Sequence, residues 1–271
     1  MRLPRYALLG VLCAMLLMSV GCTTSEPSQP AEKSGSEEDQ AEGPRQIDPE
    51  ADRVLKKACS TLNSANSLSF HVEGLMDEYL DTGQLVQVTR TSQVLVRRPN
   101  GLHVETEGDD VERVAWYDGK TVTVLDREGN VYASCEAPGT VHEMLDHLVE
   151  KYGLTMPAAD VLFPKLHETL MANVQTVTYL GRSALGDAEC HHLLFEQETI
   201  DWQLWIEAGE TTVPRQLTIT YKLEEGEPQY VARFSQWNLS PKVTDATFAF
   251  KLPTGAKGIQ MSELLGIEEG E

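Results

Sequence analysis

Two stretches of this chain decide its fold class: CHHLLFEQETIDWQLWIEAGETTVPRQLTITY, residues 190–221, and PQYVARFSQWNL, residues 228–239. They contain four runs of alternating side chains, with turn residues between the runs. In one run, Leu204 and Ile206 point to one side while their neighbours point to the other. A period of two is what a strand needs when one of its faces lies in an apolar interior. We therefore predict a wide antiparallel sheet, and we expect its concave apolar face to be the functional part.

The rest of the sheet is expected on both sides of a helical insertion. Upstream, alternating runs predict strands at residues 68–77, 85–97, 101–106, 112–117, 121–126 and 131–135. Asp118-Gly119 is the strongest hairpin signal in the chain, and short connections without crossover helices imply an antiparallel meander. Downstream, the sheet is expected to resume at residues 174–180 and to end with a strand at residues 247–251.

Helix signals occur before the sheet and in its middle. Asp48 followed by Pro49 is typical of a helix start, with Asp as the N-cap and Pro at the first helical position. Thr140 and Glu143 have the spacing of a capping box, and Gly153 is a natural C-cap for the same helix. Shorter helical segments are expected at residues 158–163 and 166–173. Amphipathic helices inserted between sheet halves must close over the sheet to bury their apolar faces.

The helical insertion leaves two interpretations open. It is either a helix layer that completes the core or a movable lid over an apolar cavity. Methionine favours the second, because its flexible side chain adapts to irregular ligands. The candidate lid and cavity-lining residues are Met144, Leu145, Leu148, Met156, Leu162, Phe163, Leu204 and Ile206.

The N-terminus has the layout of an export signal. Two Arg residues precede an apolar run over residues 6–18, and small residues lead up to Cys22. Residues 1–21 are therefore expected to be a signal peptide, since the run is too short for a spanning helix. Ser-Val-Gly-Cys resembles a bacterial lipobox, which implies that Cys22 carries acyl chains. The alternative is ordinary signal-peptidase cleavage. Thr23, in place of the Asp that retains lipoproteins at the inner membrane, favours the outer membrane.

Composition predicts how the rest of the chain is organised. Residues 22–46 are rich in Glu, Ser and Pro and contain no large apolar residue before Ile47, which predicts a disordered acidic linker. One β-rich domain is expected over residues 47–261, followed by a frayed acidic tail at residues 262–271. We expect a monomer on the periplasmic side of the cell envelope, attached to the membrane by its N-terminal lipid.

The charge of the chain excludes one class of partner. It has 42 Asp and Glu against 22 Lys and Arg, giving a net charge of −20 and a pI of about 4.7. Nucleic-acid binding depends on clustered Lys and Arg that release counterions. Adhesion to anionic lipid also needs basic clusters. The balance therefore argues against nucleic acid and leaves other partners unidentified.

No stretch of the sequence gives a strong signal for a catalytic or metal-binding site. His191 and His192 suggest a metal, but adjacent residues on a strand face opposite ways, and zinc needs three or four convergent ligands. Asp201 and Trp202 are interpreted as sheet-edge structure rather than as a catalytic pair. No nucleophile elbow, phosphate loop or dinucleotide fingerprint occurs. We therefore expect no catalytic residue, no metal and no cofactor.

Several stretches resemble a known family. They are RPNGLHVE (98–105), YDGKTVTVL (117–125), MPAADVLF (156–163) and the run GDAECHH…DWQLWI…PRQLTITYK…PQY…WNL (186–239). On these residues the chain resembles an uncharacterised bacterial family of predicted periplasmic proteins over residues 47–261. More loosely, it resembles the LolA/LolB-type lipoprotein carriers. The resemblance implies a mostly antiparallel α+β fold, in which about eleven strands curl into a half-barrel around an apolar hollow that a few helices close.

The leading functional hypothesis is a non-catalytic envelope lipoprotein. It would bind or carry an acyl chain, a lipoprotein or another apolar ligand in the hollow. Burial of hydrocarbon gains about 0.8 kcal/mol per CH₂, so a hollow that excludes water is sufficient for a long chain. The alternative is a periplasmic interaction or sensing module, similar to a stress-response regulator. A hydrolase without a recognisable motif is the third hypothesis.

Overall fold

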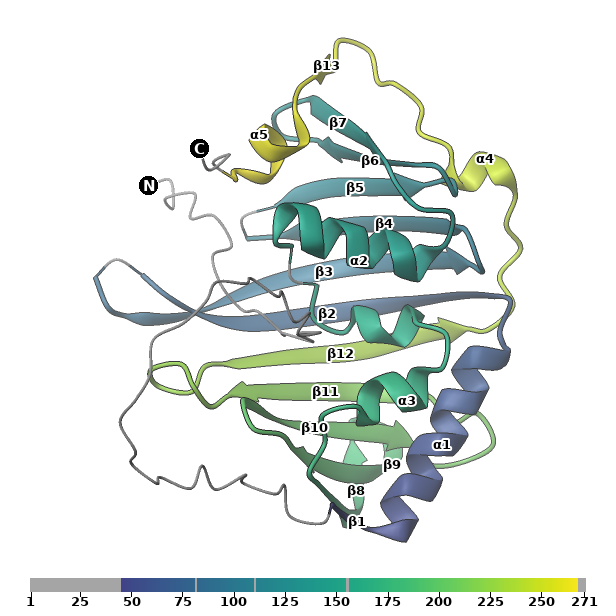
Figure 1. Ribbon diagram of the computed structural model, residues 1–271, viewed down its shortest axis with the longest axis vertical. Coiled ribbons are helices and arrows are strands. Elements are labelled where there is room, and N and C mark those ends of the chain that lie inside the picture. Colours follow the sequence, from purple (N-terminus) through teal and green to yellow (C-terminus); the bar gives the residue numbers. More distant parts are fainter. Residues whose placement is uncertain (1–44, 81, 110, 155, 268–271) are drawn as a thin grey trace, which may run out of the picture.

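Thirteen strands form one open sheet in the computed structural model, which describes residues 45–267 except 81, 110 and 155 (Figure 1). Their order is β1-β8-β9-β10-β11-β12-β2-β3-β4-β5-β6-β7-β13. The predicted antiparallel architecture is confirmed, but the strand count is thirteen rather than about eleven. The two additional strands are β1 (Gln46–Ile47) and β13 (Lys257–Gly258), which pair in parallel with β8 and β7 at the two edges.

Two antiparallel meanders make up the rest of the sheet. The first contains β2 (Ser67–Tyr79), β3 (Leu85–Arg97), β4 (Gly101–Gly108), β5 (Glu112–Tyr117), β6 (Thr121–Asp126) and β7 (Val131–Glu136). The second contains β8 (Thr176–Leu185), β9 (Ala188–Glu196), β10 (Ile200–Glu207), β11 (Pro214–Tyr221) and β12 (Gln229–Asn238). Pairing of β12 with β2 joins the two meanders into one surface.

Helix α1 (Pro49–Ser64) begins where the sequence predicts. The Asp48 side chain accepts hydrogen bonds from the backbone N–H groups of Glu50 and Ala51, at 2.8 and 3.2 Å. These bonds satisfy two donors that have no partner within the helix. The buried stripe of the helix is Ala51, Val54, Leu55, Ala58, Cys59 and Leu62.

The helical insertion forms α2 (Val141–Tyr152), the 3-10 helix η1 (Ala159–Leu162) and α3 (Leu166–Met171). The Thr140 hydroxyl caps α2 by accepting from Glu143 N–H, and Gly153 ends the helix in the left-handed region at φ 62°. Figure 1 shows α1, α2 and α3 over the same face of the sheet. That face is therefore the buried one, and it carries the core.

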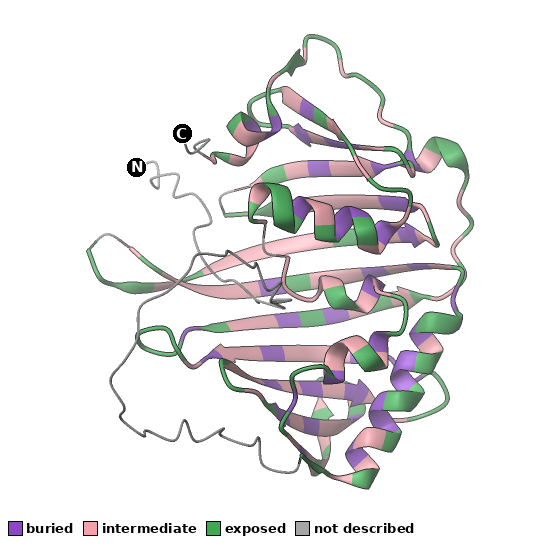
Figure 2. Cartoon of the chain, in the orientation of Figure 1, coloured by how far each residue is buried: buried purple, intermediate pink, exposed green. Residues whose placement is uncertain are grey.

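The core consists of two main clusters of buried side chains. One lies between α1, α3 and strands β8–β10, and the other lies between α2 and the central strands. Buried positions alternate along the strands, as Figure 2 shows for β10 and β12, because only one face of each strand meets the helices. The described helices contain no segment with both the length and the apolar character needed to cross a membrane.

Three boundary predictions differ from the structure. Residues 247–251 do not form a strand: α4 (Asp245–Phe248), which starts after the capping box of Thr244 and Thr247, ends among them. The expected tail begins with α5 (Met261–Leu265), since Met261 and Leu264 pack on Ala133 of β7. The predicted linker ends before Arg45, whose guanidinium donates to the carbonyls of Met171 and Ala172. The signal peptide, Cys22 and the remaining linker lie outside the described residues.

Candidate functional site

An apolar cavity of about 110 Å³ lies beneath α1 and α3. Strands β10, β11 and β12 form its floor, while α1, η1 and α3 form its walls and cover. Its apolar lining consists of Leu55, Ala58, Cys59, Leu62, Ala158, Val161, Leu166, Leu170, Ile200, Trp202, Leu204, Pro214, Leu217, Ile219 and Phe234. Burial raises the pKa of the Cys59 thiol to about 12, so this thiol stays protonated and acts as a small apolar group.

Trp202 is the largest side chain of the cavity floor. It stacks on Phe195 of the neighbouring strand with ring centroids 3.6 Å apart and planes 2° apart. The pairing register places Trp202 opposite Phe195 on one side and Ile219 on the other. Strand β10 therefore lies inside the sheet between β9 and β11, and the interpretation of Asp201 and Trp202 as sheet-edge structure is wrong.

The rim of the cavity is polar. Asp160, Thr169, Asn173 and Gln197 line it. Asp160 keeps solvent exposure, but the surrounding protein displaces part of its water and raises the pKa of its carboxyl, and Asp146 adds to the rise. The ionised form of the Asp160 carboxyl is thus disfavoured at this rim.

The cover of the cavity, formed by η1 and α3, is short, and its backbone is strained immediately before each of these two helices. Ala158, before η1, has φ 67°, and Lys165, before α3, has φ 56°. Left-handed backbone at residues other than Gly costs about 1–3 kcal/mol each where the surroundings impose it. Polar contacts to the cover include three from outside the η1–α3 segment: His167 Nε2 lies 2.8 Å from Asp52 Oδ1 of α1, Arg98 donates to the Val161 carbonyl at 3.4 Å, and Arg45 donates to the Met171 carbonyl at 3.3 Å.

The volume of the cavity bears on what it can bind. Pockets that enclose small molecules usually measure about 300–1,000 Å³. At about 110 Å³, the cavity is smaller than this range. A long hydrocarbon chain fits only if the cover of η1 and α3 moves outward.

Comparison with known proteins gives the family. A family profile described as "Predicted periplasmic protein (DUF2092)" matches residues 51–262. The chain belongs to this family. The match confirms the resemblance seen in the sequence. A search of curated proteins finds no match.

Solved structures similar to this DUF2092 chain are distant from it. The lipoprotein LppX from Mycobacterium tuberculosis is 14% identical, with a TM-score of 0.46 over 73% of this chain and 100% of that one. An uncharacterised conserved protein from Thermus thermophilus is 11% identical, with a TM-score of 0.45 over 78% and 99% of the two chains. A LolA superfamily protein from Nitrosomonas europaea is 13% identical, with a TM-score of 0.39 over 74% and 97%. None of these likenesses identifies a ligand.

The eight sequence-predicted ligand residues divide between the two core clusters of the DUF2092 domain. Leu204 lines the cavity, and Ile206 is fully buried in the same cluster. The other cluster contains Met144, Leu145, Leu148 and Leu162, with Met156 and Phe163 partly buried against it. The structure therefore gathers the six insertion residues but separates them from the two strand residues.

The cavity lies beneath α1, η1 and α3 rather than beneath α2. The buried face of α2 packs against Phe70, Val96 and Tyr117 of the central strands, so this helix completes the core there. Sequence reasoning included segments 158–163 and 166–173 in the candidate lid, but it missed the α1 wall. The spacing of Leu55, Ala58, Cys59 and Leu62 indicates the apolar face of a helix. The same spacing equally fits a helix that packs against the sheet without leaving a cavity.

The two adjacent histidines lie on opposite faces of β9. His191 Nδ1 is 2.8 Å from the Tyr179 hydroxyl, whereas His192 contacts Gln203 at 2.9 Å and stacks on Trp205 with centroids 4.0 Å apart. This arrangement follows from the alternation of a strand. Among the residues that the structure describes, no three His, Cys, Asp or Glu side chains gather as metal ligands.

Proposed function

We propose that this DUF2092 protein is a non-catalytic carrier of the cell envelope that binds an acyl chain or a similar apolar ligand beneath α1 and α3. The observation that supports this proposal is the apolar cavity itself, with Trp202 and Leu204 in its floor and a short strained helix as its cover. Each buried CH₂ contributes about 0.8 kcal/mol, so eight methylenes contribute about 6 kcal/mol before ordering costs.

Ligand entry in this proposal requires motion of the cover. The η1–α3 segment contains only a 3-10 turn and six residues of α-helix, with the left-handed residue Ala158 before η1 and the left-handed residue Lys165 between η1 and α3. Outward movement would relieve the strain at both positions and would enlarge the cavity. The polar rim of Asp160, Thr169, Asn173 and Gln197 can contact a polar head group at the mouth of the cavity.

The proposal is tested by placing a larger side chain on the cover so that it fills the cavity. Thr169 of α3 lines the cavity, whereas Ala172, one residue after α3, is exposed and does not. We expect Thr169→Phe to weaken binding of N-phenylnaphthylamine, an uncharged apolar fluorophore, by at least about tenfold, because the added ring would occupy the ligand volume. Fluorescence titration measures this effect.

Ala172→Phe is the matched control, since it adds a similar ring to the same segment without entering the cavity. Its affinity is expected to stay within about twofold of the parent. Equal binding by all three proteins, or no binding by the parent, would contradict the proposal. Native mass spectrometry of the parent protein tests the alternative function. A stoichiometric protein partner on a chain that carries no apolar ligand favours a sensing module.

The proposal also includes attachment to the envelope membrane through Cys22, with the outer membrane as the favoured location. A single acyl chain binds a membrane only marginally, while two or more anchor a protein stably. We expect Cys22→Ala to abolish metabolic labelling by an alkyne palmitate analogue and to release the protein from the membrane fraction. Unchanged labelling would place the lipid elsewhere.

A further inference from the structure

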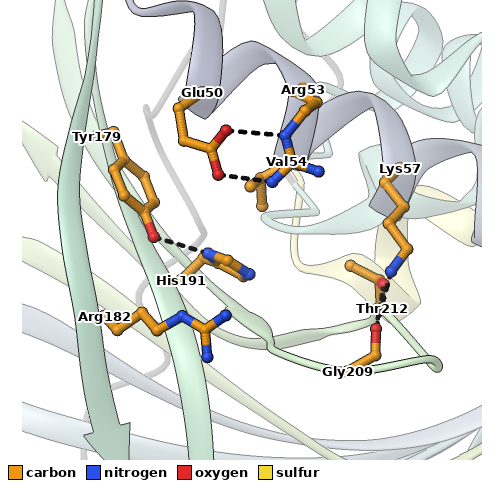
Figure 3. Close-up of a pocket in the computed structure, with 9 residues that line it drawn as sticks. All are labelled: Glu50, Arg53, Val54, Lys57, Tyr179, Arg182, His191, Gly209 and Thr212. Atoms are coloured by element: carbon orange, nitrogen blue, oxygen red, sulfur yellow. Dashed lines mark hydrogen bonds and ion pairs between the residues drawn. The ribbon is translucent and has the colours of Figure 1, made fainter.

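A second pocket, of about 350 Å³, lies against another face of α1, and its lining is polar (Figure 3). Helix α1, strands β8 and β9 and the turn between β10 and β11 form it. Arg53, Lys57 and Arg182 line it, and Glu50 is the one acidic lining residue among those described. With His191 neutral, the lining carries a net charge of +2 in a chain whose net charge is −20.

A β-bulge brings two of the donors to one face. Tyr179 and Arg182 are three residues apart, so a regular strand would point them in opposite directions. The register of β8 shifts between Tyr179 and Gly181, and Tyr179 pairs with Leu193 while Arg182 pairs with His191. Gly181 adopts φ 103°, a backbone conformation that side chains rarely permit. The extra residue thus turns the phenol and the guanidinium toward the same pocket.

The cationic side chains that line the pocket retain N–H donors that can bind a ligand. Lys57 Nζ donates to the Gly209 carbonyl at 2.8 Å, which uses one of its three N–H bonds. Arg182 contacts Glu189 through one nitrogen, and both side chains of this pair are more than half exposed. Exposed ion pairs are weak, so the guanidinium can exchange this partner for another anion. Arg53 is the more committed cation, since Glu50 accepts from two of its nitrogens.

His191 supports the phenol rather than adding charge. Burial lowers the pKa of His191, and Arg182 lowers it further, so the imidazole is neutral near pH 7. Its Nδ1 lies 2.8 Å from the Tyr179 hydroxyl, which fixes the phenol at the edge of the pocket. Figure 3 shows the Tyr179 hydroxyl, His191 and the Arg182 guanidinium directed toward the same space.

We propose that this pocket binds a phosphate group. Guanidinium groups match the geometry of phosphate oxygens with paired N–H donors, and an ammonium group adds a compact charge beside them. A dianion suits the net charge of +2 that the lining residues carry. The site is separate from the apolar cavity, because the two are lined by different residues of α1. It therefore does not rest on the proposed carrier function.

Calorimetric titration of the chain, as processed in the cell, with inorganic phosphate tests this site. We expect saturable binding that weakens at least tenfold in the double variant Lys57→Gln, Arg182→Gln. Arg233→Gln, which removes one exposed cation from β12 outside the pocket, is the control for loss of a positive charge elsewhere and should leave the affinity within twofold. Thermal unfolding of each variant establishes that the pocket, not the fold, has changed.

A second measurement distinguishes free phosphate from a lipid head group. Sedimentation with vesicles of phosphatidic acid and phosphatidylcholine is compared with vesicles of phosphatidylcholine alone, in the Cys22→Ala background. Binding to free phosphate in the titration, or to the vesicles that contain phosphatidic acid, supports the proposal if the double variant loses it. Which of the two is bound identifies the source of the phosphate group. The proposal is overturned if neither binds or if the double variant binds as the parent does. Thr169→Phe should leave phosphate binding unchanged.

Discussion

Trp202→Ala is expected to lower the free energy of unfolding by about 3–5 kcal/mol, as for other large-to-small changes of a buried aromatic. Trp202 is 5% exposed and stacks on Phe195, which is fully buried. Its removal takes away burial and stacking together, and it joins a new void to the existing cavity. A rigid strand on each side of β10 limits how far the structure can relax into this void.

Trp205→Ala provides the matched control on the same strand. Trp205 lies on the opposite face, is partly exposed and stacks on His192 with centroids 4.0 Å apart. Its loss is expected to cost about 0.5–1.5 kcal/mol, mainly from the stacked pair. Urea unfolding followed by circular dichroism measures both. Equal losses for the two variants would mean that the helix-covered face of β10 is not the buried face.

Local signals allowed much of the sheet and the helix starts to be predicted. The predicted strands at 85–97, 112–117 and 121–126 have the bounds observed for β3, β5 and β6. The Asp48 cap and the Gly153 stop are also where the sequence places them. These features depend on side-chain alternation, on capping hydrogen bonds and on left-handed turns, all of which are encoded within a few residues.

The position of the cavity could not be predicted in this way. Whether an apolar stripe leaves a gap depends on volumes contributed by distant segments, such as Leu62 of α1, Leu170 of α3 and Phe234 of β12. Periodicity shows which side chains face inward but not how well they fill the space. The grouping of Tyr179 with Arg182 was equally hidden, because it depends on a bulge whose only local trace is Gly181.

Residues 247–251 show that a local pattern can also predict an element that the structure does not form. Their apolar alternation, Phe248 and Phe250 with Ala249 between them, predicts a strand. In the structure, Thr244 caps α4, and Phe248 packs against Gly101 at the start of β4. A hydrophobic anchor on a loop and a short strand can share one sequence pattern, and tertiary contacts decide between them.

Phe248→Ala is the second change with a large expected effect, a loss of about 3–5 kcal/mol in the free energy of unfolding. Phe248 is 1% exposed, and the Arg97 guanidinium lies 4.8 Å from its ring centroid. The side chain thereby anchors the segment between β12 and β13 onto β4. Phe250→Ala, which removes a partly exposed ring that contacts Trp116 and Tyr132, is the control and is expected to cost about 1–2 kcal/mol.

The contact with Gly101 allows a sharper test by a double-mutant cycle. A Cβ added at Gly101 would lie 2.9 Å from two carbons of the Phe248 ring, so Gly101→Ala alone forces the ring to shift. In the Phe248→Ala background this clash is absent, and Gly101→Ala should then have little further effect. The two changes are therefore expected to be non-additive, with the double variant more stable than the sum of the single losses predicts. Simple additivity in urea unfolding would mean that Phe248 does not lie over Gly101, and that another contact attaches this segment to the sheet.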